Sequence, residues 1–504
     1  MSRRAASAVS VGMHPAAAWR RRTRLAEVTA ERIWPLAIWV AMAAWTVVLC
    51  VTVRGAYESF RLGRFDLGHM VQAVWSTAHG RPLEVTHSAT GEQVLRLAGH
   101  VDPFLVLLTP IWVAWPSPLS LAFAQIAVVS LGALPVYWLG RRYLASRSAP
   151  GLLALAYLAY PWLAWSALGA IHPVTFAIPF YLFAFWFLDT GRLLPFALFA
   201  ALAMSTGELM GLPILALGLW YAAARSRPRP GLLIAAAGLA WTLVAVYVVV
   251  PAAAGRESMF YGFYDQVGGS PQGVARRLLV DPGTVLGALV EAHDLAYLAL
   301  LAAPLAGLFP LAPGVALAGA PQLVANLLSD FRSMTDPRYH SIAAVFPFLL
   351  LATVLGIARL RGFRQAPTAA LVLLLCVATA VLLGPWARTI GKVPLGVERD
   401  RTPERVAALR QAIELVPDGV PVTASNSAGA HLSARRYVYV VPVLGRAEWA
   451  VVDLREPWAV RADSPILTKR PRAIRAVVSR LERDPRWRKV FERERVVVFR
   501  KSAP

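Results

Sequence analysis

The sequence predicts an α-helical polytopic membrane protein with about eleven transmembrane helices, followed by a small α/β domain outside the membrane. Of the 504 residues, 57% are hydrophobic and 16% are charged, whereas soluble proteins carry roughly a quarter charged residues. The apolar residues also form runs that are long enough to span a bilayer. From Trp386 onward the composition changes to a charged, soluble pattern.

The charge distribution indicates membrane topology and contact with anionic lipid, with no nucleic-acid partner. The chain has 51 basic and 29 acidic residues, which gives a formal net charge of +22. The arginines lie mostly in the N-terminal tail, in short loops and in the C-terminal part. Cys50 and Cys376 both lie in apolar runs, which excludes a CxxC motif and a disulfide framework.

The N-terminal part is predicted to start inside the cell. Residues 1–32 are basic and lack the apolar core of a secretory signal, so we expect a cytoplasmic tail. Residues 33–53 are apolar without a cleavage site and predict the first transmembrane helix. Residues 54–101 then form a large outer loop, and a loop of this length indicates a function.

The transmembrane domain is expected to cover residues 33–385. The further spans are placed at 118–140, 150–170, 173–190, 193–207, 208–224, 231–252, 290–309, 311–327, 341–358 and 366–385. This topology puts the short arginine-rich loops on the cytoplasmic side, as the positive-inside rule requires. The apolar segment 103–115 is short and is expected to be re-entrant or interfacial, and 193–224 has the alternative of one long tilted helix.

Residues 386–504 are predicted to form a soluble extracytoplasmic α/β domain. Residues 403–416 and 472–483 have helical patterns. Strands are predicted at 420–424, 437–443, 449–454 and 496–499. The many arginines of this domain do not oppose an outer location, because long domains translocate largely regardless of charge.

With this topology, polar residues that interrupt the apolar sequence gather on the outer side. They are Asp66, His100, Asp102, His172, Glu208, Asn326, Tyr339 and His340. One outward-facing polar cavity would explain them together. The alternative is that outer loops carry polar residues for solvation alone.

Asp66 precedes a segment with the pattern of a short amphipathic helix at the membrane interface. The apolar face of this helix consists of Leu67, Met70, Val71, Val74 and Trp75. Asp66 would lie at the N-cap, which is a sufficient structural reason for an aspartate. The functional interpretation is a general base or a metal ligand, with His69 one turn away.

Two further pairs of titratable residues interrupt apolar sequence. His100 and Asp102 are two residues apart and could share a proton or a metal, although Asp102-Pro103 is equally suited to begin a helix. His172 and Glu208 have apolar sequence around them, and an ionisable residue at membrane depth indicates a functional site. Glu208 could instead pair with His172 or an arginine, or lie less buried in an outer turn at 205–207.

The segment from Asn326 to His340 is predicted to be an outer loop. Its Arg332, Arg338 and His340 are candidates to bind an anionic head group such as a phosphate, and a solvated loop is the alternative. The second candidates for this task, in the outer loop 254–281, are Arg256, Arg276 and Arg277. The sequence contains no P-loop, GxGxxG after a strand, HExxH or GxSxG motif, which argues against a nucleotide-driven pump.

A series of ordered motifs resembles a prokaryotic family of predicted polytopic membrane proteins of unknown function. The motifs are Phe65–Gly68, Gln72–Trp75, Gly99-His100, Pro103, Gln125, Tyr160-Pro161, His172-Pro173, Gly207-Glu208, Pro321, Asn326–Ser329 and Tyr339-His340. The resemblance runs from about residue 33 into the C-terminal domain. That family is similar to the GT-C superfamily of glycosyltransferases.

The GT-C resemblance implies a polyprenyl-phosphate sugar donor and an acidic residue in the first outer loop, and only Asp66 matches that position. Asp66 would deprotonate an acceptor hydroxyl or bind a divalent cation, Mg²⁺ or Mn²⁺, with Asp102 as a second ligand. Arginine or histidine side chains would neutralise the departing lipid phosphate. Gly207 departs from the pattern, because a basic residue is expected before the acid.

We therefore expect a glycosyltransferase of the inner (plasma) membrane that acts on an envelope glycan, lipid or protein acceptor. The expected catalytic residues are Asp66, His69 and Glu208. The expected substrate-binding residues are His100, Asp102, His172, Asn326, Arg332, Arg338, Tyr339 and His340. A transporter or lipid flippase that uses Glu208 and His172 is the alternative, although the sequence shows no internal repeat. An envelope scaffold without chemistry of its own is a third.

Overall fold

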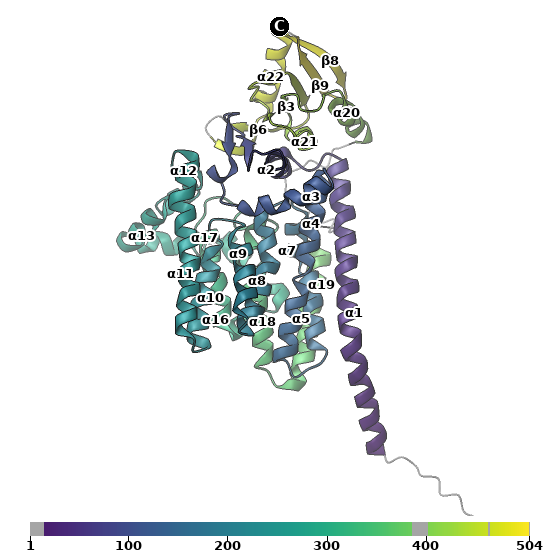
Figure 1. The fold of residues 1–504 in the computed structure, drawn as a ribbon, viewed down its shortest axis with the longest axis vertical. Coiled ribbons are helices and arrows are strands. Elements are labelled where there is room, and N and C mark those ends of the chain that lie inside the picture. Colours follow the sequence, from purple (N-terminus) through teal and green to yellow (C-terminus); the bar gives the residue numbers. More distant parts are fainter. Residues whose placement is uncertain (1–14, 386–401, 462–463, 503–504) are drawn as a thin grey trace, which may run out of the picture.

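The computed structural model describes residues 15–385, 402–461 and 464–502. A bundle of helices lies below a small α/β domain, and the segment around α2 lies between them (Figure 1). The first fourteen residues of the predicted basic tail lie outside the described residues, as do residues 386–401 at the predicted domain boundary.

Helix α1 (Pro15–Glu58) includes the rest of the predicted tail and the first predicted span. It runs along the edge of the bundle and extends beyond it (Figure 1). Its part Ile33–Glu58 is long and apolar enough to cross a membrane, and Leu36, Trp39 and Val51 are more than half exposed. Such apolar exposure fits a lipid-facing surface.

Helices of the bundle are short and frequently begin at proline, which fits the first turn of a helix. The helices after residue 101 are η3 (Pro103–Leu108), α3 (Thr109–Ala114), α4 (Pro118–Ser130), α5 (Ala133–Tyr143), α6 (Ala149–Ala159), α7 (Pro161–Leu168), α8 (Pro173–Asp189), α9 (Leu193–Met204), α10 (Gly211–Ala224), α11 (Pro228–Val244), η4 (Ala245–Val249) and α12 (Val250–Ala254). They are followed by η5 (Met259–Val267), α13 (Pro271–Val280), α14 (Pro282–Ala288), α15 (Ala292–Ala302), η6 (Ala303–Leu305), η7 (Phe309–Leu311), α16 (Pro313–Ala316), η8 (Leu317–Gly319), α17 (Ala320–Leu327), η9 (His340–Ile342), α18 (Phe346–Ala358) and α19 (Gly362–Leu383).

By length and composition, the described residues contain 4 helices able to cross a membrane, or up to 6 if each bent pair of helices is one span. The 17 residues of α8 rise about 26 Å, which is less than a bilayer core of about 30 Å. The predicted number of eleven is therefore not confirmed. The alternative of one long helix over 193–224 is wrong, because a turn separates α9 from α10.

The predicted first outer loop, residues 54–101, is well structured. It contains η1 (Arg64–Gly68), α2 (His69–Ala78), an antiparallel hairpin of β1 (Glu84–Thr86) and β2 (Gln93–Leu95), and η2 (Arg96–Ala98). The predicted amphipathic helix is confirmed as α2, but its apolar residues Met70, Val71 and Val74 are buried in the protein core. Amphipathicity alone could not distinguish a protein-covered face from a lipid-covered one.

The C-terminal domain is a mixed sheet with helices on both faces. Its elements are α20 (Pro403–Glu414), β3 (Val422–Ala424), α21 (Asn426–His431), β4 (Val438–Val440), β5 (Trp449–Asp453), β6 (Trp458–Arg461), β7 (Ser464–Lys469), α22 (Pro471–Arg483), β8 (Trp487–Arg493) and β9 (Val496–Lys501). The main sheet has the order β4-β3-β5-β9-β8, with the first three strands parallel and the last two antiparallel to their neighbours. Both predicted helices and all four predicted strands are confirmed.

Candidate functional site

Asp66 lies within the π-helical turn η1, between α1 and α2. The N-cap of this turn is Gly63, so the predicted N-cap role of Asp66 is wrong. The Asp66 side chain is 26% exposed, and its Oδ1 lies 3.7 Å from Nε2 of His172. The turn therefore presents a carboxylate to the residue that precedes α8.

A buried amide fixes His172. The backbone N–H of His172 donates to Oε1 of Gln125 at 2.8 Å, and Nε2 of Gln125 donates to the carbonyl oxygens of Ala167 and Ala170. Pro173 then begins α8 directly after His172. Gln125 thus joins α4 to the turn between α7 and α8, which positions the imidazole opposite Asp66.

His340 stacks on His172, with ring centroids 4.0 Å apart and an interplanar angle of 20°. Within the described part of the chain, Nδ1 of each ring is buried and has no hydrogen-bond partner. Burial, together with positive charge from His172, His100 and Arg96, lowers the pKa of His340 well below its usual value. His340 is therefore neutral at pH 7, and both rings have a nitrogen available to a ligand.

Tyr339 and Asn326 belong to the same region with different surroundings. Burial raises the pKa of Tyr339, and the negative charges of Asp336 and Asp66 add to this effect. Asn326 is fully buried, and its Nδ2 donates to the Tyr297 hydroxyl and to the Ser341 carbonyl, both at 3.1 Å. Asn326 therefore anchors the backbone next to His340. The negative charge of Asp66 acts on the Tyr339 hydroxyl.

Glu208 lies in the turn between α9 and α10 and is paired with His100. Its Oε1 is 3.3 Å from Nδ1 of His100, and its Oε2 accepts the N–H of Val101 at 3.1 Å. The alternative of a pairing with His172 or an arginine is therefore wrong, because the partner is His100. The Glu208 side chain is 20% exposed. Burial acts to raise the pKa of Glu208, but His100 and the backbone donors outweigh it and lower this pKa.

Asp102 forms a buried ion pair with Arg96. Nε and Nη2 of Arg96 lie 3.1 and 2.8 Å from Oδ2 of Asp102, and the two side chains are 8% and 2% exposed. Pro103 begins η3 as predicted, but the Asp102 side chain does not cap it. The predicted sharing of a proton or metal between Asp102 and His100 is therefore replaced by an ion pair with Arg96.

The described residues contain no group of three or more His, Cys, Asp or Glu side chains that could hold a metal ion. With Asp102 paired to Arg96, Asp66 would be the carboxylate ligand of a divalent cation here. Mg²⁺ is commonly bound by one or two carboxylates together with substrate phosphate oxygens and water. A cation at Asp66 fits only in that manner, with substrate as a co-ligand.

The two arginines that were predicted to bind a head group, Arg332 and Arg338, interact with acidic residues of the protein instead. Nε of Arg338 donates to both carboxylate oxygens of Asp336, at 2.9 and 3.1 Å, so its charge is already paired. Arg332 is exposed, and its charge acts on Asp294 of α15. Of the second candidates, Arg277 pairs with Asp281 at 3.1 Å. Asp336 lies two residues before Arg338 and Asp281 lies four residues after Arg277, so sequence spacing was the available signal for both pairs.

His69 begins α2, and its pKa is well below the usual value. Burial is the largest cause, followed by the positive charges of Arg64 and Arg96 and by the effects of His87 and His100. Chain segments distant in sequence therefore meet in one cluster, which we call the Asp66 cluster. Its members are Asp66, His69, His100, His172, Glu208, Tyr339 and His340.

Aromatic residues of η5 cover part of the Asp66 cluster and were not among the predicted site residues. Phe260 stacks on His100 with ring centroids 4.5 Å apart. Burial raises the pKa of Tyr264 to about 12, and the charge of Glu208 contributes. The density of aromatic residues in MFYGFYDQV was the available signal for this cover. Arg96, which no motif contains, was also missed.

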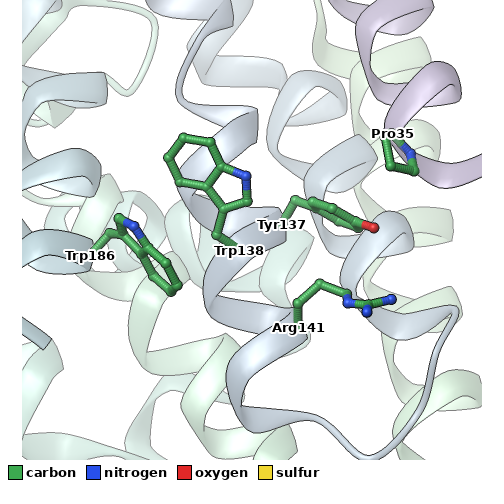
Figure 2. A pocket seen from close by; sticks show the side chains of 5 residues that line it. All are labelled: Pro35, Tyr137, Trp138, Arg141 and Trp186. Atoms are coloured by element: carbon green, nitrogen blue, oxygen red, sulfur yellow. The ribbon is translucent and has the colours of Figure 1, made fainter. Parts of the chain in front are cut away.

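A pocket at the other end of the bundle is separate from this site. It has a volume of about 470 Å³ and is lined by Pro35, Tyr137, Trp138, Arg141 and Trp186 (Figure 2). Trp186 follows His172 by fourteen residues, which corresponds to about 20 Å along α8. The pocket therefore does not contain the Asp66 cluster.

Comparisons with solved structures show the fold. ArnT from Cupriavidus metallidurans bound to undecaprenyl phosphate aligns with a TM-score of 0.53 and 12% identity, over 91% of this chain and 97% of that one. The apo state of the same protein aligns with a TM-score of 0.50 and 14% identity, over 91% and 98%. The apo oligosaccharyltransferase of Archaeoglobus fulgidus aligns less well, with a TM-score of 0.38 and 12% identity over 82% and 70%.

The alignments with ArnT show that this chain shares the fold of that protein at low sequence identity. No curated protein matches the chain. Residues 56–498 match a family described as a predicted membrane protein, DUF2079, and this match covers most of the chain. The chain therefore belongs to the DUF2079 family of predicted membrane proteins.

Proposed function

We propose that the protein is a membrane glycosyltransferase that transfers a sugar from a polyprenyl-phosphate-linked donor to an envelope acceptor. The observation that carries this proposal is Asp66, presented on a turn opposite the stacked pair His172 and His340, whose Nδ1 atoms are buried and unpartnered in the described residues. The fold of ArnT, which was solved with undecaprenyl phosphate, supports the choice of lipid.

In the proposed reaction, Asp66 is the general base. Its carboxylate takes the proton from an acceptor hydroxyl while the hydroxyl oxygen forms a bond to the anomeric carbon of the sugar. The bond between that carbon and the phosphate oxygen breaks, and the polyprenyl phosphate leaves with the electron pair. If Asp66 instead binds a divalent cation, the cation would neutralise charge on the phosphate.

The histidine pair is proposed to receive the lipid phosphate. A neutral imidazole has one N–H that can donate to a phosphate oxygen, and His340 is neutral at pH 7. A buried Nδ1 without a partner carries a free-energy cost that a phosphate oxygen would remove. The Tyr339 hydroxyl, within the field of Asp66, is proposed to contact the sugar.

The remaining predicted residues are proposed to act by position or by charge. Glu208 contacts His100 and the backbone of Val101, so we assign it to positioning of the His100 segment. Asn326 positions the backbone at Ser341, next to His340. His69 is proposed to remain neutral beside Asp66. These assignments replace the direct catalytic role that the sequence suggested for Glu208.

The proposed location is the inner (plasma) membrane, with the N-terminus in the cytoplasm and the Asp66 cluster and α/β domain outside. The distribution of arginines supports this orientation. Arg142 and Arg225 both pair with Asp189 at the C-terminal end of α8, whereas His172 precedes its N-terminal end. Positive charge at that end of the bundle is typical of the cytoplasmic side.

The alternative of a proton-coupled transporter or flippase has less support. It required Glu208 and His172 at membrane depth, and Glu208 lies in a partly exposed turn and is paired with His100. An ionisable group in an outer turn does not carry the cost that marks intramembrane sites. The experiment below separates the two functions, because a transporter would not require a base at Asp66.

The test is mass spectrometry of polyprenyl-phosphate sugars and envelope glycans in cells that lack the protein. We expect one lipid-linked sugar to accumulate and one glycan to lose a residue. Wild type and Glu92→Gln, an acid of the same outer loop that contacts Thr90, should restore both. Asp66→Asn should restore neither. Unchanged pools, or full restoration by Asp66→Asn, would contradict the proposal.

A further inference from the structure

The turn that carries Asp66 is in direct contact with the C-terminal domain. Helix α21 packs against η1, and Oδ1 of Asn426 accepts the backbone N–H of Phe65 at 2.8 Å. The first N–H groups of a helical turn lack partners within the turn, and an N-cap side chain normally accepts them. Gly63 has no such side chain. Asn426 supplies the missing acceptor, although it belongs to the C-terminal domain and lies 361 residues after Phe65 in the sequence.

Arg64 connects the same turn to three other segments. Its side chain is fully buried, and Nη2 donates to Oε1 of Gln72 at 3.0 Å, the Thr86 carbonyl at 2.9 Å and the Val438 carbonyl at 3.1 Å. Burial lowers its pKa to about 10, so the guanidinium remains charged at pH 7. Among the described residues, none of its hydrogen-bond acceptors is a carboxylate. Removing any of these acceptors would leave part of a buried charge unsatisfied.

Three glycines permit this close contact. A Cβ at Gly63 would overlap the side-chain amide of Asn426, and a Cβ at Gly68 would overlap the hydroxyl of Ser433. A Cβ at Gly429 would lie 2.8 Å from Cβ of Arg64. Gly68 has a φ of −66°, so glycine is required there for space and not for backbone conformation. The turn therefore contacts α21 or the residues that follow α21 from Arg64 at its beginning to Gly68 at its end.

The chain before the turn is anchored in the same domain. Phe60 is 1% exposed and belongs to the hydrophobic core that α20 forms with the main sheet. His431 of α21 stacks on Tyr57 with ring centroids 4.0 Å apart, and its Nε2 lies 3.1 Å from the Tyr57 carbonyl oxygen. The segment that leads from α1 to Asp66 is thus held by the C-terminal domain at Tyr57 and Phe60 and by the bundle core at Leu62.

We infer that the C-terminal domain holds the Asp66 carboxylate in its active orientation. The positioning residues are Asn426 of this domain and Arg64 of η1. This inference rests on the proposed function and deepens it. Asn426 fixes the backbone of η1 at Phe65, and Arg64 fixes the same turn to α2, to the hairpin and to β4. Together they orient the Asp66 carboxylate toward His172. Neither side chain contacts the substrate.

The experiment compares variants of Asn426 in the full-length protein in nanodiscs. Asn426→Ala removes the acceptor of the Phe65 N–H, whereas Asn426→Asp retains an acceptor oxygen. The matched control is Arg436→Ala, which breaks the 3.2 Å ion pair with Glu84 across the same domain boundary without contacting η1. Deuterium uptake of peptides that contain Phe65 reports the state of the turn without requiring activity.

The expected results differ between the variants. Asn426→Ala should accelerate exchange in the Phe65 peptides by about threefold to tenfold, the range of one lost hydrogen bond. It should lower the turnover number for release of polyprenyl phosphate by about 10- to 100-fold with little change in KM, as for a misplaced catalytic group. Asn426→Asp should recover both values in large part, and Arg436→Ala should change neither.

The outcomes that overturn this inference differ from those that overturn the function. Unchanged exchange in Asn426→Ala, or faster exchange with normal turnover, would show that the domain does not position Asp66. Equal losses in Asn426→Ala and Arg436→Ala would also contradict the inference, because they would indicate general instability of the domain boundary. Normal turnover in Asp66→Asn would instead overturn the proposed function, whatever the exchange data show.

Discussion

At the scale of single residues, the Asp66 cluster depends on the buried charge pair between Arg96 and Asp102. Arg96 lowers the pKa of both His69 and His340, and its own charge is compensated by Asp102. An uncompensated guanidinium in this environment would be costly. The Arg96–Asp102 pair therefore allows a positive charge to lie near two neutral histidines.

Asp102→Asn is expected to lower the free energy of unfolding by roughly 3–5 kcal/mol, because it leaves Arg96 buried without its counter-charge. The matched control is Glu58→Gln, which breaks the exposed Arg54–Glu58 pair at a cost of about 1 kcal/mol or less. Denaturant titration of the purified protein in detergent measures both. Similar values for the two variants would show that Arg96 has another source of compensation.

The histidines predict how stability depends on pH. His69 and His340 have lowered pKa values in the folded state, whereas an unfolded histidine titrates near 6.5. As the pH falls below about 6.5, the unfolded chain binds protons that the folded chain does not, so stability is lost toward acid. Glu208, whose folded pKa is also lowered, contributes the same sign only below its unfolded pKa, near pH 4.5.

The measurement is the melting temperature between pH 7.5 and pH 5. Each histidine should contribute a slope of up to about 1.4 kcal/mol per pH unit. The double variant His69→Gln/His340→Gln should show a flatter profile, and His79→Gln, at an exposed position, should match the wild type. Wild-type stability that is equal at pH 5 and pH 7.5 would contradict the assignment of neutral, buried rings.

Sequence reasoning named every member of the cluster but not the partners of these residues. Each ionisable residue in apolar sequence can be recognised by itself, and the structure brings Asp66, His172 and His340 together. Arg96 could not be recognised as the partner of Asp102, because the sequence does not show that the Arg96 side chain is buried. The sequence indicates that a charged residue such as Asp102 needs a counter-charge, and only the fold shows that Arg96 supplies it.

At the scale of elements, the contact between η1 and the residues that follow α21 can be tested by a compensating pair. Gly68→Ala should lower the free energy of unfolding by roughly 1–3 kcal/mol, because the added Cβ overlaps Oγ of Ser433. Adding Ser433→Gly should recover part of this loss, although it removes the hydrogen bond to the Gly429 carbonyl. Gly287→Ala, at a helical position with open space, serves as the control.

The coupling between the two substitutions is read from a double-mutant cycle in the same denaturant titration. A loss in Gly68→Ala that Ser433→Gly does not reduce would mean that the two segments do not touch in solution. A Gly68→Ala protein as stable as the Gly287→Ala control would lead to the same conclusion.

Elements with strong local patterns were predictable, and elements defined by long-range contacts were not. The helices α20 and α22 follow from apolar periodicity, and the buried strands β3 and β5 follow from their β-branched residues. The missed strand β8 is an exposed edge strand with mostly charged residues, so it has no such pattern. The π-helical turn at Asp66 was missed as well, because its geometry depends on Asn426 in another domain.

At the scale of the whole molecule, the Asp66 cluster and the paired arginines occupy opposite ends of the bundle. The cluster lies next to the α/β domain, and Arg142 and Arg225 meet Asp189 at the other end of α8. The proposed orientation makes a direct prediction for labelling.

Single cysteines introduced into a Cys50→Ala/Cys376→Ala protein test the orientation. Arg410→Cys lies on the exposed face of α20 in the C-terminal domain, and Arg227→Cys lies in the exposed loop before α11. In intact cells, a membrane-impermeant maleimide should label position 410 and should reach position 227 only after permeabilisation. Equal labelling of both positions, or the reverse order, would contradict an outer location of the Asp66 cluster.

The central claim is that Asp66 acts on a polyprenyl-phosphate sugar, and the most direct measurement is release of polyprenyl phosphate by the purified protein. The protein in nanodiscs would be incubated with lipid-linked sugars and acceptors extracted from cells that lack it. We predict release by wild type and by Glu92→Gln, and a loss of at least about 100-fold in folded Asp66→Asn. Release by Asp66→Asn at the wild-type rate would contradict the account.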